Sequence, residues 1–247
     1  MQAIPDHENS RLKQLAMTDS LSSNLDMSLY EALLERRKRG EPLQYIEEEV
    51  SFYGIHIEVN PNVLIPRPET EFFIEKIIDR AKDPKKIIDV GTGSGCIGLA
   101  LAKHFNDAEV HLTDISFEAL QVAKKNSYKN KIEVSIYQSN LLKGVKDRGF
   151  NLIVGNLPYI PSNEVVDLPA EVLNYEPILA LDGGQEGLDC IAKLIKEAKN
   201  ILSTNGLLAL EIDTRSGDKL KELTIDYTNV EIVCDLTGRD RYVFATK

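Results

Sequence analysis

Short apolar runs and amphipathic segments alternate along the chain from about residue 69 onward. The runs KKIIDV, FNLIVG and GLLALEI are almost continuously apolar, as strands buried on both faces of a parallel sheet are. Segments of helical period separate the strand-like runs, among them GCIGLALAKHF, FEALQVAKKN and GLDCIAKLIKEAKNIL. This alternation predicts βαβ units and an α/β fold around a largely parallel sheet.

Two further strand-like runs, NVEIVCDL and RYVFATK, close the sequence, and they lie near enough in the chain to pair antiparallel. With EVHLTDI and KIEVSIYQ they bring the predicted strands to seven. A dinucleotide-binding sheet usually has six parallel strands. The pattern therefore favours a Rossmann-like sheet of another kind, with seven strands and an antiparallel last strand.

The first part of the chain follows a different pattern. Residues 1–48 are polar and poor in strand signals, and SLYEALLERRKRG within them predicts a short amphipathic helix with a basic end and a stop at Gly40. Residues 49–66 alternate like a hairpin. We therefore divide the chain into a short helical N-terminal segment (1–48), a hairpin linker (49–68) and a main domain (69–247). The helical segment is too small to hold a core alone.

Charge and hydropathy exclude several classes of protein. Lys and Arg number 29 against 39 Asp and Glu, a formal net charge of −10, which argues against a protein that works by gripping a phosphate backbone. The longest apolar run falls far short of the ~20 residues that a membrane span needs. The N-terminus shows no secretory signal. We expect no membrane contact and no direct contact with nucleic acid.

Cysteines and histidines give no sign of a metal site. The three cysteines, Cys96, Cys190 and Cys234, are odd in number and form no CxxC, so a disulfide framework or a zinc site is disfavoured. The four histidines form no pair with ligand spacing. We predict that the chain holds no metal and works in a reducing cytoplasm.

A glycine-rich loop, DVGTGSG at residues 89–95, follows a predicted strand and opens a predicted helix. Glycines permit a tight turn and close approach of a ligand to the backbone, and a helix N-terminus offers free N–H groups. The third glycine of the dinucleotide fingerprint is missing, because Cys96 stands in its place. We predict that the loop binds a cofactor, with a plain strand-to-helix turn as the alternative. The residues assigned to the cofactor here are Asp89, Gly91, Thr92, Gly93 and Gly95.

The charges of the loop indicate which cofactor is bound. The carboxylate of Asp89 would repel a phosphate but suits an amine or a sulfonium, and S-adenosylmethionine carries both and no phosphate. Asp114, with Ile115 beside it, ends the next strand, where a carboxylate can accept hydrogen bonds from both ribose hydroxyls. It can also cap the helix that starts near Ser116. Asn140 ends the third strand, where an adenine contact or a simple turn is expected. We predict S-adenosylmethionine as the cofactor.

The segment FNLIVGNLPYIP indicates the acceptor of the methyl group. Its strand ends where Asn156, Leu157, Pro158 and Tyr159 leave the sheet at the carboxyl edge, where ligands bind. A planar amide or aromatic amine is a poor nucleophile, so catalysis needs acceptors on its N–H bonds that aim the nitrogen lone pair. The side-chain carbonyl of Asn156 and the backbone carbonyl of Leu157 are suitable acceptors. Pro158 keeps Leu157 extended, and Tyr159 can stack on a flat acceptor. An ordinary proline turn is the alternative.

Taken together, these blocks resemble the release factor glutamine methyltransferase family over roughly residues 29–247. The resemblance rests on ERRKRGEPLQYI, FYGIHIEVNPNVLIPRPETE, DVGTGSGCIGLALA, GNLPYIP, YEPILALDGGQEGLD and GRDRYVF, in this order. It implies a class I methyltransferase fold and methyl transfer from S-adenosylmethionine to a glutamine side-chain amide. That glutamine lies in the Gly-Gly-Gln motif of peptide chain release factors, so the reaction would modulate translation termination.

The resemblance also assigns residues and partners. It implies that Asn156, Leu157, Pro158 and Tyr159 hold the glutamine and that Asn156 also borders the cofactor. It also implies that the Pro-Arg-Pro-Glu-Thr block borders the site through Arg67, Pro68, Glu69 and Thr70, with Arg67 and Glu69 at the substrate. Release factors would be the protein partners, and we expect the chain to act as a monomer. Gly183-Gly184-Gln185 has the sequence of the modified motif, but we interpret it as a loop that leads into a helix.

Three features depart from the family pattern. The family usually has Asn-Pro-Pro-Tyr, and Leu157 keeps the backbone carbonyl but loses rigidity worth on the order of 0.4–1 kcal/mol. Asn-Leu-Pro-Tyr is also the form common in ribosomal RNA adenine dimethyltransferases, which makes a nucleic-acid amino-methyltransferase the alternative function. The N-terminal helical region is about half the family's usual length, which bears on how a release factor docks.

Overall fold

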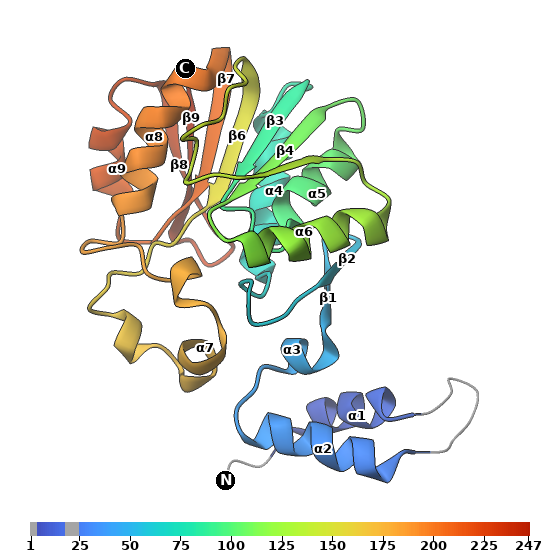
Figure 1. Cartoon of the computed structure of the whole chain (residues 1–247). Coiled ribbons are helices and arrows are strands. Elements are labelled where there is room, and N and C mark those ends of the chain that lie inside the picture. Colours follow the sequence, from blue (N-terminus) through green and yellow to red (C-terminus); the bar gives the residue numbers. More distant parts are fainter. Residues whose placement is uncertain (1–3, 18–24) are drawn as a thin grey trace.

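A seven-stranded sheet forms the centre of the computed structural model, which describes residues 4–17 and 25–247. The strands lie in the order β5-β4-β3-β6-β7-β9-β8 (Figure 1). Each neighbouring pair from β5 to β7 is parallel, and β9 is antiparallel to both β7 and β8. This confirms the predicted α/β class I methyltransferase fold, Rossmann-like and with an antiparallel last strand. The strands are β3 (Lys86–Val90), β4 (Glu109–Asp114), β5 (Ser135–Gln138), β6 (Phe150–Asn156), β7 (Leu202–Glu211), β8 (Thr228–Cys234) and β9 (Asp240–Thr246).

Helices cover both faces of the sheet (Figure 1). Successive residues of a strand point to opposite faces, so Ile87 packs with α4, α5 and α6 while Ile88 packs with α8 and α9. Both isoleucines are fully buried, as a strand in the middle of a parallel sheet requires. The helices are α4 (Pro68–Arg80), α5 (Cys96–His104), α6 (Phe117–Asn130), α8 (Asp189–Ile201) and α9 (Gly217–Leu223). The sequence pattern had not revealed α4.

The described part of the N-terminal region contains three helices, α1 (Asp6–Leu15), α2 (Met27–Lys38) and α3 (Leu43–Glu47). The predicted amphipathic helix is α2, and part of the predicted segment 1–48 lies outside the described residues. The side chain of Asp26 caps α2 by accepting a hydrogen bond from the Leu29 N–H at 3.0 Å. These helices share a small core separate from the two large ones, formed by Leu12, Ala16, Leu33, Leu43 and Ile46.

The predicted hairpin over residues 49–66 is shorter in the structure. Only β1 (Glu49–Phe52) and β2 (Ile55–Glu58) pair, and residues 59–67 carry no strand. Pro61 and Pro66 lack an N–H group, so the stretch that contains them is a poor partner in a ladder. The side-chain amide of Asn126 on α6 binds both the N–H and the carbonyl of Glu58, at 2.7 and 3.0 Å. The hairpin is therefore fixed to α6 of the main domain, and the division of the chain at residues 48 and 68 stays a prediction.

A long connection links β6 to α8 beyond the carboxyl edge of the sheet (Figure 1). It contains the short helices η1 (Val165–Asp167), α7 (Ala170–Tyr175) and η2 (Ile178–Ala180), and its last part holds the Gly-Gly-Gln tripeptide. That tripeptide lies in the loop before α8, as predicted. Within residues 4–17 and 25–247, no helix combines the length and hydropathy needed to cross a membrane.

We expect Gly98→Ala to destabilise the protein, because a Cβ atom at this position on α5 would lie 2.1 Å from Leu112 Cδ2 on β4. Overpacking of this kind costs about 1–3 kcal/mol in the free energy of unfolding, which urea denaturation measures. Lys124→Ala, at an exposed position on α6, is the control and should change that free energy by no more than about 0.5 kcal/mol. Equal effects of the two variants would show that α5 does not pack against β4 as described.

Candidate functional site

A cavity of about 270 Å³ opens at the carboxyl ends of β3, β4, β5 and β6. Ligands bind at this edge in open α/β sheets, because the loops that leave neighbouring strands meet there. Of the residues predicted from the sequence, the wall contains Gly91, Thr92, Gly93, Asp114, Ile115, Asn140, Asn156, Leu157, Pro158, Arg67 and Thr70. Five others, Asp89, Gly95, Tyr159, Pro68 and Glu69, lie outside the wall and are described in turn below.

The glycine-rich loop brings its backbone to the cavity. Gly91, Gly93 and Gly95 all have positive φ, at 70°, 55° and 85°, a region that other residues enter at a cost. Gly95 caps the N-terminus of α5 and packs against Ala123 of α6 instead of facing the cavity. The glycines therefore shape a turn that brings the start of α5 to the cavity, where its first N–H groups can meet a ligand.

Asp114 joins the loop to the end of β4. Its Oδ2 accepts a hydrogen bond from the Gly93 N–H and its Oδ1 accepts one from the Ser116 N–H, both at 2.9 Å. Each carboxylate oxygen keeps a further lone pair for a hydroxyl group. Burial raises the pKa of Asp114, while these backbone N–H groups oppose the rise. Asp114 thus orders the loop and faces the cavity, and helix capping falls to the Ser116 hydroxyl, which accepts from the Ala119 N–H at 3.1 Å.

Asp89 lies behind the glycine loop and not on the cavity wall. Its side chain is fully buried, and Oδ2 accepts hydrogen bonds from the Thr92 hydroxyl at 2.6 Å and the Gly98 N–H at 2.9 Å. Its Oδ1 is buried without a hydrogen-bond partner. Burial raises the pKa of Asp89 to about 6. The observed contacts support the fold of the loop, and the direct contact with a cofactor amine stays a prediction.

The Asn156–Tyr159 segment forms the opposite side of the cavity. Asn156 ends β6, and its Nδ2 donates to the Thr70 hydroxyl oxygen at 3.3 Å. The Leu157 side chain is buried, and its Cδ2 would lie 2.7 Å from a Cβ atom at Gly91. Among the hydrogen bonds recorded for residues 4–17 and 25–247, none uses the Leu157 carbonyl. Asn156 and Leu157 thus both lie on the cavity wall, and the role of their carbonyl groups as acceptors stays a prediction.

Tyr159 turns toward the sheet. Its hydroxyl donates to Glu211 Oε1 at 3.2 Å, and the Arg241 guanidinium lies 5.7 Å from its ring centre. Burial raises the pKa of Tyr159, and the carboxylate of Glu211 adds to the rise. The structure therefore gives Tyr159 a partner that the sequence did not suggest, and stacking on the acceptor stays a prediction.

The Pro-Arg-Pro-Glu-Thr block contributes Arg67 and Thr70 to the cavity wall, whereas Pro68 and Glu69 lie outside it. Arg67 lies on the wall and donates to Glu176 Oε1 at 2.5 Å, which ties α4 to the connection after β6. Glu69 is exposed and does not line the cavity, while its backbone carbonyl accepts from the Tyr242 hydroxyl at 2.8 Å. Its contact with substrate stays a prediction.

Several wall residues were not predicted. Asn62, Val63 and Leu64 lie at the end of the hairpin linker, and Ser139 follows β5. Pro177, Leu179 and Ala180 lie at η2, and Cys190 lies in the first turn of α8. The blocks that carry the family resemblance contain most of them. No residue pattern distinguishes them as ligand contacts, because most are apolar side chains that a core would also use.

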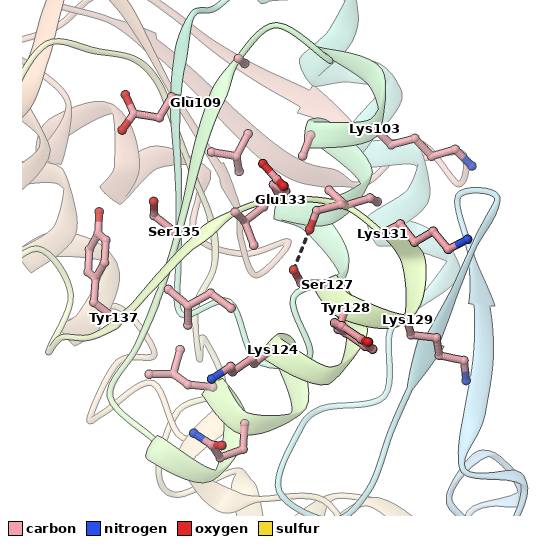
Figure 2. Close-up of a pocket in the computed structure, with 18 of the residues that line it drawn as sticks. Lys103, Glu109, Lys124, Ser127, Tyr128, Lys129, Lys131, Glu133, Ser135 and Tyr137 are labelled. Atoms are coloured by element: carbon pink, nitrogen blue, oxygen red, sulfur yellow. Dashed lines mark hydrogen bonds between the residues drawn. The ribbon is translucent and has the colours of Figure 1, made fainter.

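A second, wider hollow lies at the outer edge of the sheet, between α6 and β5 (Figure 2). Lysines surround it, but Lys129 pairs with Glu49 and Glu58, and Lys103 donates to the Gly54 carbonyl at 2.8 Å. The hydrogen bond drawn there runs from the Ser127 hydroxyl to a backbone carbonyl. Its lining contains neither the glycine loop nor the Asn156–Tyr159 segment. We therefore assign the chemistry to the cavity at the carboxyl edge.

One group of possible metal ligands, Glu109, His111 and Asp147, comes together in the described part of the chain. The ammonium of Lys86 lies 3.6 Å from the Glu109 carboxylate and 3.5 Å from the Asp147 carboxylate. The Tyr137 hydroxyl lies 2.5 Å from Nδ1 of His111. The positive charge of Lys86 therefore already lies close to both carboxylates, and the group of three possible ligands lies outside the cavity wall.

Comparison with known proteins decides the family. Residues 68–174 match the family described as "Methyltransferase small domain". A release factor glutamine methyltransferase of Koribacter versatilis is 39% identical over 225 residues, which cover 90% of this chain and 80% of that protein. The chain belongs to the release factor glutamine methyltransferase family. Its relative in Bacillus anthracis is 35% identical over 239 residues, covering 93% of this chain and 84% of that protein.

Solved structures agree on the fold. A methyltransferase from Pyrococcus furiosus superposes with a TM-score of 0.62 at 22% identity and covers 90% of this chain and 99% of that chain. A 16S ribosomal RNA methyltransferase of Thermus thermophilus, solved with S-adenosylmethionine and guanosine, gives a TM-score of 0.58 at 16% identity, covering 81% and 49%. At these identities the likeness concerns the sheet and its helices and not the substrate.

The cavity of this family member fits S-adenosylmethionine better than a dinucleotide. Arg67 is the one Lys or Arg among the described wall residues, and it is already paired with Glu176. A pyrophosphate would therefore meet no free cation there, and the acid at Asp114 suits the ribose hydroxyls that both ligands carry. The unpartnered Oδ1 of Asp89 adds negative charge beneath the loop. The residues present thus match a ligand that carries positive charge and no phosphate.

We expect Asp114→Ala to weaken binding of S-adenosylmethionine by about 1–3 kcal/mol, because both ribose hydroxyls would lose their acceptor. Isothermal titration calorimetry measures this change in affinity. Asp107→Ala, which removes an exposed acid far from the cavity, should leave the affinity as it is. An unchanged Kd in Asp114→Ala would remove this carboxylate from the cofactor site.

Proposed function

We propose that this protein transfers a methyl group from S-adenosylmethionine to the side-chain amide nitrogen of a glutamine in peptide chain release factors. By the family likeness, that glutamine is the one in the Gly-Gly-Gln motif. The observation that carries the proposal is the position of Asn156 and Leu157, which line the same cavity as the glycine loop. Two relatives named release factor glutamine methyltransferase support the same substrate, and this chain covers 80% and 84% of their lengths.

The chain's own residues supply orientation and electrostatics. S-adenosylmethionine supplies an electrophilic methyl carbon on a sulfonium. The Asn156 side-chain carbonyl and the Leu157 backbone carbonyl each accept one N–H of the glutamine amide, which turns the nitrogen lone pair toward that carbon. As the N–C bond forms and the C–S bond breaks, positive charge moves from sulfur to nitrogen, and the two carbonyl dipoles stabilise it there. The proton leaves the cationic nitrogen afterwards, so the site needs no strong base.

A protein substrate is supported over RNA by the distribution of charge. The basic end of α2 is the densest group of cations, and its members pair with acids: Arg36 with Glu41, Arg37 with Glu8, and Lys38 with Glu35. The net charge of −10 also disfavours a phosphate backbone as partner. We include in the proposal that the chain works as a monomer in the cytoplasm, without direct contact with nucleic acid.

The deciding experiment is incubation of the protein with labelled S-adenosylmethionine and a purified release factor, followed by mass mapping of the label. We expect one methyl group on the glutamine of the Gly-Gly-Gln motif. A parallel incubation with ribosomal RNA should take up no label. Label in the RNA and none in the release factor would establish the amino-methyltransferase alternative and overturn the proposal.

We predict that Asn156→Ala lowers kcat for methyl transfer by about 10²-fold or more, because one of the two acceptors that align and stabilise the amide is lost. The affinity for S-adenosylmethionine, measured by calorimetry, should stay near that of the unchanged protein. Asn106→Ala, at an exposed asparagine outside the cavity wall, is the matched control and should keep both values. If Asn156→Ala lost cofactor affinity to the same degree as kcat, Asn156 would belong to the cofactor and not to the acceptor.

A further inference from the structure

A chain of hydrogen bonds runs from the cavity into the core behind Asn156. Nδ2 of Asn156 donates to the Thr70 hydroxyl oxygen at 3.3 Å, and the Thr70 hydroxyl donates to Glu211 Oε2 at 2.9 Å. The Tyr159 hydroxyl donates to the other carboxylate oxygen, Oε1, at 3.2 Å. Thr70 lies in the first turn of α4, and Glu211 ends β7 in register with Asn156 on β6. Four parts of the fold therefore meet at one carboxylate.

The direction of this chain follows from which groups can donate. An ionised carboxylate accepts hydrogen bonds and cannot donate them, and a threonine hydroxyl has one proton. Because Thr70 gives that proton to Glu211, its oxygen has only lone pairs left for Asn156. The asparagine must then present its NH2 group to Thr70. The reversed amide would place the Asn156 carbonyl oxygen against the lone pairs of Thr70, an unfavourable contact inside a buried site.

The orientation matters for the cavity, because the two ends of the amide have opposite hydrogen-bonding capacity. With NH2 held by Thr70, the carbonyl oxygen is the end left for the glutamine N–H. A reversed amide would offer the glutamine nitrogen a donor instead of an acceptor. Such an arrangement neither aligns the nitrogen lone pair nor stabilises the charge that develops on nitrogen.

We propose that Thr70 and Glu211 are positioning residues, which fix the side-chain amide of Asn156 with its carbonyl oxygen toward the methyl-accepting glutamine. The inference rests on the proposed function, because it assigns the same cavity a glutamine acceptor. Both residues are buried, with exposed fractions of 2% each, so water does not compete for their hydrogen bonds. Burial raises the pKa of Glu211, whereas the Thr70 and Tyr159 hydroxyl donors and the positive charge of Arg241 oppose that rise and favour the ionised carboxylate that the chain requires.

Two substitutions at Thr70 separate hydrogen bonding from packing. Thr70→Val keeps the shape and removes both the donor and the acceptor, whereas Thr70→Ser keeps the hydroxyl and removes a methyl group. We expect Thr70→Val to lower kcat by about 10- to 100-fold, with the Kd for S-adenosylmethionine unchanged by calorimetry. Thr70→Ser should stay within about threefold of the unchanged protein. The opposite order, with valine active and serine impaired, would assign Thr70 a packing role and overturn the proposal.

A measurement on the unchanged protein tests the orientation without methyl transfer. In a ¹⁵N-labelled sample, the side-chain NH2 signals of Asn156, identified by their loss in Asn156→Ala, should show nuclear Overhauser contacts to the Thr70 methyl group. NH2 protons of Asn156 that exchange freely with solvent and show no contact to Thr70 would overturn the inference. Failure of the unchanged protein to methylate a release factor would instead reject the proposed function, and the spectrum would still decide how Asn156 is held.

Discussion

The buried carboxylate of Glu211 is the constraint on which the acceptor side of the cavity depends. It sits at the end of β7 beside Asn156 and accepts hydrogen bonds from Thr70 of α4 and from Tyr159 of the loop after β6. Removing a charge from water is costly unless it is hydrogen-bonded, so these partners are held to it. The first turn of α4 and the Asn156–Tyr159 segment are thereby fixed to one point of the sheet.

The sequence was sufficient for the parts of the fold that depend on local pattern. Continuous apolar runs identified β3, β6 and β7, and the spacing of the last two runs identified the antiparallel β9. The pattern missed α1, in which Leu12 is the one buried residue, and it missed α4 behind its proline-rich start. It extended the hairpin past Glu58, because alternation alone does not register that prolines cannot pair.

The candidate site could likewise be predicted only in part from the sequence. The glycine loop and the Asn156–Tyr159 segment could be found because their residue types have few other uses at strand ends. The contacts of Asp89 could not be foreseen, since a carboxylate after a strand can face the ligand or turn under the loop, and packing decides which. Glu211 was not predicted, because its hydrogen-bond partner Thr70 lies 141 residues away in the sequence and no local pattern encodes such a pairing. A 16S ribosomal RNA methyltransferase shares this fold at 16% identity, so the fold by itself does not identify the substrate.

Leu157 has a consequence that reaches across the cavity. Its Cδ2 would lie 2.7 Å from a Cβ atom at Gly91, so a side chain at that glycine would displace the leucine methyl group, and the Asn156–Tyr159 segment packs directly on the glycine loop. A proline ring at this point would have stiffened one loop from within. The leucine instead couples two loops through van der Waals contact, so that neither can shift without disturbing the other. In the proposed reaction, packing between these two loops would set the distance between methyl donor and methyl acceptor before either ligand binds.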